Sequence, residues 1–176
     1  STFVRGMSRG AVIDAGGAFP VFTAAEPIRE LNLLEIELAN GRAQQQGGCI
    51  DGTGVGSVAR LYAVDVVFRN CQVESVQESK GGAIYWPGRR LELRYNRFIG
   101  NRVHAKGVNG VARGGAVAAE PGTWVFAEGV RFESNAAEGA DSEGGDISLS
   151  GRGQLREVIS TGARAGSRGG SVAHRC

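Results

Sequence analysis

The chain has 176 residues, a length typical of a single domain, and 29 of them are glycine. Valine outnumbers leucine by 18 to 9, which favours strands and tight turns over helices. The formal net charge of +2 and the absence of an apolar run of 18 residues exclude a strongly basic nucleic-acid-binding module and a membrane-spanning helix.

Alternating apolar and polar residues predict short strands along the chain. The clearest examples are residues 34–38, 64–68 and 91–93. Segment 24–40 could alternatively form a helix, but Pro27 and the alternation within it favour strands. No other segment carries a long helical pattern.

A Gly-Gly pair recurs along the chain, each time followed by a small or polar residue and then by an apolar one. The second glycines of these pairs are Gly17, Gly48, Gly82, Gly115, Gly145 and Gly170. We expect them to be structural anchors of a repeat, where the chain either turns with positive φ or approaches its neighbour closely. A Cβ at these positions should therefore be destabilising.

A second marker precedes the glycine pairs. It is a large apolar residue followed, three positions later, by a small or amide residue. Its clearest copies end at Asn101 and Asn135, and both markers recur with a period of about 30 residues. Asparagines at the same place in successive repeats can form a ladder of side-chain amides, and they also suit turns.

A unit of this length, with short strands and glycine turns, is typical of one coil of a parallel β-helix. The sequence therefore predicts an all-β fold, a right-handed parallel β-helix of about five to six coils, over the single domain 1–176. Because neither end carries a visible capping helix, we expect a fragment of a longer chain or end-to-end association of copies.

The segments 81–84 (GGAI), 114–117 (GGAV), 98–101 (FIGN) and 132–135 (FESN) resemble the GGA[ILV] and FxxN repeats of the chlamydial polymorphic outer membrane proteins. That resemblance implies a pectin-lyase-like parallel β-helix. It also implies a secreted passenger that acts in adhesion, and hence an extracellular or cell-surface location.

We expect one apolar residue after each glycine pair to face the core. This column is Phe19, Ile50, Ile84, Val117, Ile147 and Val172. The residues on either side of it are then expected to face outward, and among them only Asp51 and Asp146 are carboxylates. They would lie three coils apart, roughly 14 Å, which is too far for a paired acid/base mechanism. The sequence therefore predicts no catalytic residue on this face.

The cysteines are too few for a disulfide framework. Cys49 and Cys71 are either bonded to each other or small buried residues. The acidic segment 141–146 could bind calcium, although a solvated acidic turn is favoured. No cysteine or histidine cluster has the spacing of a metal site, and we expect neither a metal nor a cofactor.

One basic and aromatic stretch is a possible partner-binding surface. It consists of Tyr85, Trp86, Arg89, Arg90, Arg94, Arg97, Arg102, His104 and Lys106. The stretch could meet an acidic glycan or a phosphate, or it could be an ordinary solvated face balanced by Glu92. Residues 102–113 form the longest connection, which we expect to be a loop outside the coil core. Trp124 is expected in the core.

These features together predict a non-catalytic extracellular or cell-surface β-helix, either an adhesin-like passenger or a structural segment of a surface assembly. One alternative is an enzyme of the polysaccharide lyase or hydrolase type. Another is a self-assembling module of a fibre, sheath or appendage. The expected partner is a protein or glycan on a surface, or neighbouring copies end to end. We expect no nucleic acid partner and no membrane insertion.

Overall fold

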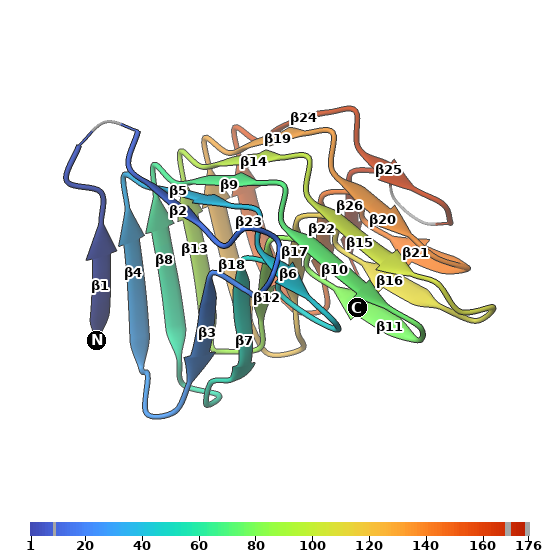
Figure 1. The fold of residues 1–176 in the computed structure, drawn as a ribbon, viewed down its shortest axis with the longest axis horizontal. Coiled ribbons are helices and arrows are strands. Elements are labelled where there is room, and N and C mark those ends of the chain that lie inside the picture. Colours follow the sequence, from blue (N-terminus) through green and yellow to red (C-terminus); the bar gives the residue numbers. More distant parts are fainter. Residues whose placement is uncertain (9, 168–169, 175–176) are drawn as a thin grey trace.

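The structure is a computed structural model that describes residues 1–8, 10–167 and 170–174. Its sheets are parallel and stack as a β-solenoid of about five turns (Figure 1). No helix occurs among these residues, so segment 24–40 forms strands. Within the same ranges no helix is long and apolar enough to cross a membrane. The prediction of an all-β fold of stacked parallel coils is confirmed.

Three sheets enclose the main core, and in Figure 1 the strands of sheet A stand side by side. Sheet A consists of β1 (Thr2–Arg5), β4 (Glu30–Leu34), β8 (Arg60–Val64), β13 (Arg90–Arg94), β18 (Trp124–Glu128) and β23 (Arg152–Arg156). Sheet B consists of β2 (Val12–Asp14), β5 (Glu37–Ala39), β9 (Val67–Arg69), β14 (Arg97–Ile99), β19 (Arg131–Glu133) and β24 (Ile159–Thr161). Sheet C consists of β3 (Phe22–Ala25), β7 (Ile50–Gly54), β12 (Ile84–Trp86), β17 (Val117–Ala119), β22 (Ile147–Leu149) and β26 (Val172–His174).

Two further sheets form an arm that projects between sheets B and C in the turns that follow β5, at the lower right of Figure 1. Sheet D consists of β6 (Arg42–Ala43), β10 (Gln72–Ser75), β15 (Arg102–Ala105), β20 (Ala136–Glu138) and β25 (Arg164–Ala165). Sheet E consists of β11 (Glu78–Lys80), β16 (Val111–Arg113) and β21 (Asp141–Glu143). A second, smaller apolar core fills the arm, formed by Val73, Val103, Ala105, Ala112 and Ala137.

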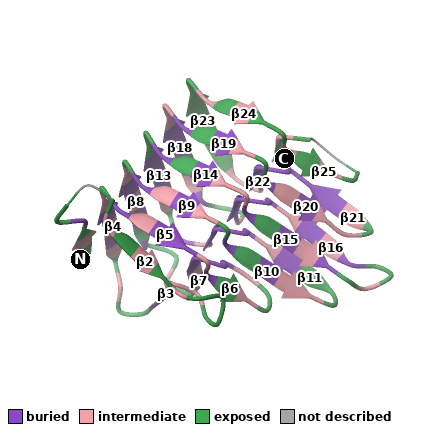
Figure 2. Cartoon of the chain, turned by 45° about the horizontal axis from the view of Figure 1, so that its top comes forward, coloured by how far each residue is buried: buried purple, intermediate pink, exposed green. Residues whose placement is uncertain are grey.

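The arm corrects the expectation that residues 102–113 form a loop outside the core. Strands β15 and β16 occupy both ends of this segment, and only residues 106–110 connect them. Val103 and Ala112 are fully buried, because they contribute to the core of the arm. Figure 2 shows the buried stripes along these strands.

A column of aromatic rings runs through the middle of the main core. The register of sheet B places Leu38, Phe68, Phe98 and Phe132 in line. The three rings are buried and stack with their centroids 4.6 and 4.9 Å apart. Both faces of Phe98 are thus covered by another ring, an arrangement that stabilises beyond the apolar area it buries.

Two corners of each turn are made by single residues with positive φ. Between sheets A and B they are Glu35, Asp65, Tyr95, Gly129 and Glu157, with φ from 50° to 62°. Between sheets B and D they are Asn40, Asn70, Gly100, Ser134 and Gly162, with φ from 52° to 69°. One left-handed residue bends the chain sharply, and its amide still donates to the next turn, as Asp65 does to Arg94 at 3.0 Å.

The two glycines of a Gly-Gly pair have different roles. In five pairs the first glycine has φ close to 60°, as Gly114 does. The second lies against the next turn, because a Cβ built on Gly82 or Gly115 would be 2.0 Å from a carbonyl oxygen of that turn. Gly17 and Gly170 differ, since a Cβ there would meet nothing within 4 Å.

The expected core column is in register from Ile50 through Ile84 to Val172. Its first member was wrongly predicted. Phe22, and not Phe19, pairs with Ile50, and Phe19 is 73% exposed. The reason is that three more residues separate the first glycine pair from its strand than separate the second pair from β7.

Although Ala18 is exposed and Ser171 half-buried, the residue directly after each of the other four glycine pairs points inward, which corrects the expectation that it faces solvent. These residues are Cys49, Ala83, Ala116 and Asp146, and all are fully buried. Each still lies in the corner, so the in–out alternation of the strand begins one residue later. Asp146 is therefore an interior group. Segment 141–146 is strand β21 followed by this corner rather than an acidic turn.

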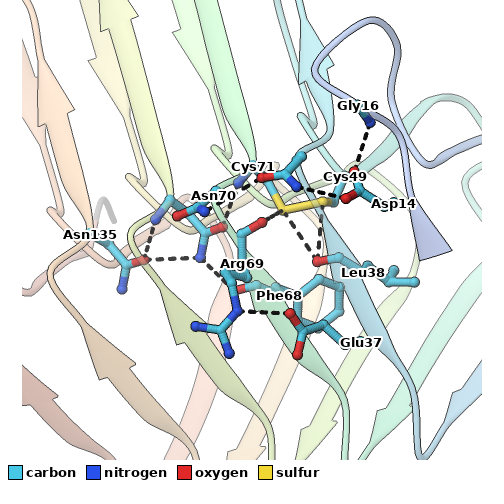
Figure 3. Close-up of a disulfide and its surroundings, with 12 residues drawn as sticks. Asp14, Gly16, Glu37, Leu38, Cys49, Phe68, Arg69, Asn70, Cys71 and Asn135 are labelled. Carbon is cyan, nitrogen blue, oxygen red and sulfur yellow. Dashed lines mark hydrogen bonds and ion pairs between the residues drawn. A yellow bond between two sulfur atoms is a disulfide. The ribbon is translucent and has the colours of Figure 1, made fainter. Parts of the chain in front are cut away.

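Cys49 and Cys71 are bonded to each other across this interior corner, with their Cα atoms 5.3 Å apart (Figure 3). Of the two alternatives left open by the sequence, pairing is the correct one. The Cys71 amide donates to Asn101 Oδ1 at 3.0 Å, and the Asn101 amide donates to Asn135 Oδ1 at 2.9 Å. The disulfide thus continues a buried column of asparagines.

The last turns close the same corner with polar groups. Asn135 Nδ2 donates to Asp146 Oδ1 at 2.9 Å. The hydroxyls of Ser160 and Ser171 donate to Oδ2 at 2.5 and 2.9 Å. Burial raises the pKa of Asp146, and these three hydrogen bonds oppose that rise.

Candidate binding face

The nine residues predicted as a partner-binding surface belong to one turn but not to one face. Arg90 and Arg94 are on sheet A, Arg97 on sheet B, Arg102 and His104 on sheet D, Tyr85 and Trp86 on sheet C, and Arg89 and Lys106 in connections. Trp86 is fully buried in the main core. Because the chain bends at each corner, residues adjacent in sequence diverge to different sides of the solenoid.

On the arm, the cations of this stretch face acidic groups. Glu74 lies 2.7 Å from Arg42 and also pairs with Lys106. The hydrogen bond from Lys106, followed by that from Arg42, holds the pKa of Glu74 below its usual value. Arg102 pairs with Glu138 of the next turn. Arg42, Arg102 and Lys106 are therefore all paired with carboxylates.

The outer side of sheet A, by contrast, gathers arginines and aromatic residues from four consecutive turns. We call it the arginine–aromatic face. It comprises Arg60, Tyr62, Val64, Arg90, Glu92, Arg94, Trp124, Phe126, Glu128, Arg152, Gln154 and Arg156. Alternate residues such as Leu61 and Leu91 are buried, so these twelve point to the outer side. Trp124, which we expected in the core, is half-buried on this face.

Glu92 lies at the centre of the face and holds two arginines. Its carboxylate is 2.8 Å from Arg90 and 2.7 Å from Arg94, which flank it on the same strand. The strand register places Tyr62 and Phe126 on either side of it, and Glu92 is only 7% exposed. A buried carboxylate with two guanidinium partners restrains both side chains.

The aromatic rings of β18 lie between the guanidinium groups of the neighbouring strands. Arg90 lies 4.5 Å from the centroid of Trp124. Phe126 has Arg94 at 5.3 Å and Arg156 at 5.9 Å from its centroid. Ring faces attract cations, so these contacts order the arginines of β13 and β23 around the row of rings between them.

The face is more positive than the chain as a whole. It carries five arginines against two glutamates, a formal charge of +3, whereas the whole chain carries +2. Among the described residues, no carboxylate forms an ion pair with Arg60, Arg152 or Arg156. These three guanidinium groups are therefore available to an anionic ligand.

A second polar cluster joins sheet E to sheet C. Lys80 lies 2.7 Å from Glu120 and 3.3 Å from Glu78, and Arg113 lies 2.8 Å from Glu78. Burial, and then the charge of Glu120, raises the pKa of Tyr85, so this phenol stays protonated. The charges are matched in pairs and tie two sheets together. In the part of the chain that is described, no three acidic, histidine or cysteine side chains are placed to hold a metal ion.

Sequence reasoning grouped basic residues by their proximity along the chain, and so missed the face. The signal that could have found it is the repeat itself. Aligned on the two markers, Arg60, Arg90, Trp124 and Arg152 occupy one column of successive turns.

Comparison with protein families, with curated proteins and with solved structures finds no match for this chain.

Proposed function

We propose that this chain is a non-catalytic part of an extracellular or cell-surface protein, where it acts as an adhesin-like passenger or as a structural segment of a surface assembly. The observation that carries the proposal is the arginine–aromatic face. It is a set of cations on the outer side of one sheet, of which Arg90 and Arg94 are restrained by Glu92 and by the rings of β18. Such a surface binds anionic groups without needing to change shape.

Two further features support a location outside the cell. Disulfides form and persist mainly in oxidising compartments, and the buried Cys49–Cys71 bond fits that setting. The GGA[ILV] and FxxN repeats resemble those of the chlamydial polymorphic outer membrane proteins, which implies a pectin-lyase-like surface passenger.

The side chains of the face suit binding better than catalysis. A hydrolase or lyase needs an acid and a base close to the bond that breaks. The face has only two carboxylates, and Glu92 is already paired with two arginines. Asp146, which the sequence suggested as an outward carboxylate, lies in the interior.

The test is binding of the labelled chain to intact cells at increasing salt concentration, measured by flow cytometry. We expect saturable binding that weakens with salt, because exposed charges are screened beyond about 8 Å at physiological ionic strength. Release of reducing sugars from a panel of polysaccharides would instead establish the enzyme alternative. Concentration-dependent self-association without cell binding would establish the self-assembling alternative.

A further inference from the structure

We infer that the arginine–aromatic face binds an extended polysaccharide that carries an acidic group on alternate sugars, with the glycan chain running across the strands. This inference rests on the proposed function and names the class of ligand. The outward residues of each strand form one row of the face. The outward residues of β13 and β23 include two arginines each, whereas those of β18 between them are Trp124, Phe126 and Glu128.

The strand register places the arginines opposite one another across β18. Arg90 and Arg152 both align with Trp124, and Arg94 and Arg156 both align with Glu128. Adjacent strands are about 4.8 Å apart, so the two arginine rows repeat at roughly 9.6 Å. An extended glycan places the acidic groups of alternate sugars at a comparable separation, and each would meet a guanidinium on β13 or β23.

The outward residues of β18, between the two arginine rows, disfavour a glycan that carries an acidic group on every sugar. Arg94 and Arg156 align with Glu128, so a sugar that crosses β18 between these two arginines would lie beside the carboxylate of Glu128. A neutral sugar can rest there, whereas an acidic one would meet a like charge in place of an arginine. On this account Glu128 determines specificity, and the arginines supply affinity. Arg60 on β8 extends the positive surface by one more turn.

The guanidinium groups are partly ordered before any ligand arrives. Glu92 and the ring faces restrain Arg90 and Arg94, and Phe126 contacts Arg156. Less side-chain entropy is then lost on binding, and planar guanidinium groups can bind carboxylates or sulfates through two hydrogen bonds. A nucleic acid is a poorer fit, since a duplex carries a charge about every 1.7 Å and the face offers a net charge of +3 over four strands.

The test measures binding of the full chain to three glycans at physiological salt by isothermal titration calorimetry. Hyaluronan carries a carboxylate on alternate sugars, polygalacturonate carries one on every sugar, and dextran is neutral. We expect hyaluronan to bind at least about tenfold more tightly than polygalacturonate, and dextran not to bind. Equal or tighter binding of polygalacturonate would overturn the inference.

Two variants locate the site. Arg152→Gln with Arg156→Gln should weaken hyaluronan binding at least about tenfold, because both arginines are exposed and contact the ligand directly. Arg97→Gln with Arg131→Gln removes the same charge from sheet B and should change binding less than about twofold. An equal loss in both variants would indicate non-specific attraction and overturn the inference.

A third variant tests the selecting residue. Glu128→Gln should bring the affinity for polygalacturonate closer to that for hyaluronan, and unchanged discrimination would contradict the role of Glu128. The two proposals fail in different ways. If the unmodified chain binds cells but does not bind hyaluronan, the proposed function stands and the glycan site falls. If the unmodified chain binds neither cells nor any glycan, the proposed function itself falls.

Discussion

Different side chains fill the same interior corner in two regions of the solenoid. In the N-terminal turns Cys71 is bonded to Cys49, and neither cysteine titrates. In the C-terminal turns Asn135 donates to Asp146, and two serines complete the partners of the buried carboxylate. The column of backbone amides that donate to Asn101 and Asn135 side chains connects the two regions.

This difference shows that the corner tolerates several side chains as long as each is satisfied. A buried polar group without a partner is costly, whereas a disulfide needs none. The two regions should therefore respond to different conditions, the first to reductant and the second to pH. Four predictions test whether they are separate or coupled.

The largest effect should come from breaking the aromatic stack that joins the two regions. Phe98→Ala leaves a cavity between Phe68 and Phe132 and should lower the free energy of unfolding by about 4 kcal/mol in urea denaturation followed by circular dichroism. Phe19→Ala is the matched control, since Phe19 is 73% exposed and its loss should have little effect. Two separate transitions in the Phe98 variant would mean that the regions unfold independently.

Reduction should act on the N-terminal region alone. The disulfide joins residues 22 positions apart, and opening it should cost about 3 kcal/mol by freeing the unfolded chain. The measurement is the urea midpoint with and without dithiothreitol. The variant Cys49→Ala with Cys71→Ala should be as unstable as the reduced protein and insensitive to reductant. A midpoint shift in that variant would refute the assignment.

The glycine column is common to both regions, and a Cβ there should destabilise the chain wherever the next turn is close. Gly115→Ala would place its Cβ 2.0 Å from the carbonyl oxygen of Gly145, which should cost about 2 kcal/mol or more. Gly170→Ala, at the same place in its repeat, meets nothing within 4 Å and should be nearly neutral. Equal melting temperatures for the two variants would mean that the register is wrong.

The smallest effect should be a pH dependence confined to the C-terminal region. Because burial raises the pKa of Asp146 in the folded chain, its protonated form is favoured there. Its contribution to stability is complete below the ordinary pKa of about 3.9 and is lost as pH rises through the raised value. Asp146→Asn should therefore gain stability relative to the unmodified chain as pH rises above about 4, and this should be the smallest of the four effects.

The measurement for this prediction is the free energy of unfolding from pH 3 to pH 7. Asp65→Asn serves as the control, since Asp65 is exposed at a corner where asparagine is equally suited to positive φ. A difference between Asp146→Asn and the unmodified chain that does not change with pH would contradict the raised pKa.

The repeat markers predicted the fold because they recur in successive turns at positions where the structure permits few residue types. Gly82 admits no side chain, and Phe98 fills the core between two like residues. The arm was not predicted, because its strands are short and its core is made of the small side chains of alanine and valine. Cys49 and Asp146 were predicted to face solvent, because the in–out alternation of side chains was taken to begin in the corner. It begins at the first residue of the strand instead.

The arginine–aromatic face could not be found by reading along the chain. Arg90 and Trp124 are 34 positions apart and touch only because one turn stacks on the next. The register that brings them together depends on the number of residues in each connection. Reasoning from local composition instead grouped Arg90 with Lys106, which lies at the end of the arm.

From β4 onward, the turns of this chain differ in length at two points only. In the first turn the step from sheet A to sheet B is longer, because Thr2 aligns with Leu31 and Ile13 with Leu38. The step from sheet A to sheet B is seven residues in the turns that begin with Leu31, Leu61, Leu91, Val125 and Gly153. The step from sheet E to sheet C is always five, from Ser79, Ala112 and Ser142. By contrast, the arm tip spans six, nine and five residues in the turns that begin with Val73, Val103 and Ala137.

The other variable point is the return from sheet C to sheet A, which takes seven residues after Ile84 and eight after Val117. Insertions and deletions at these two points leave the stacked columns aligned, because the strands on either side keep their register with the neighbouring turns. A foreign peptide should therefore be accommodated between Lys106 and Gly110, and a descendant sequence can gain or lose residues there without losing its fold.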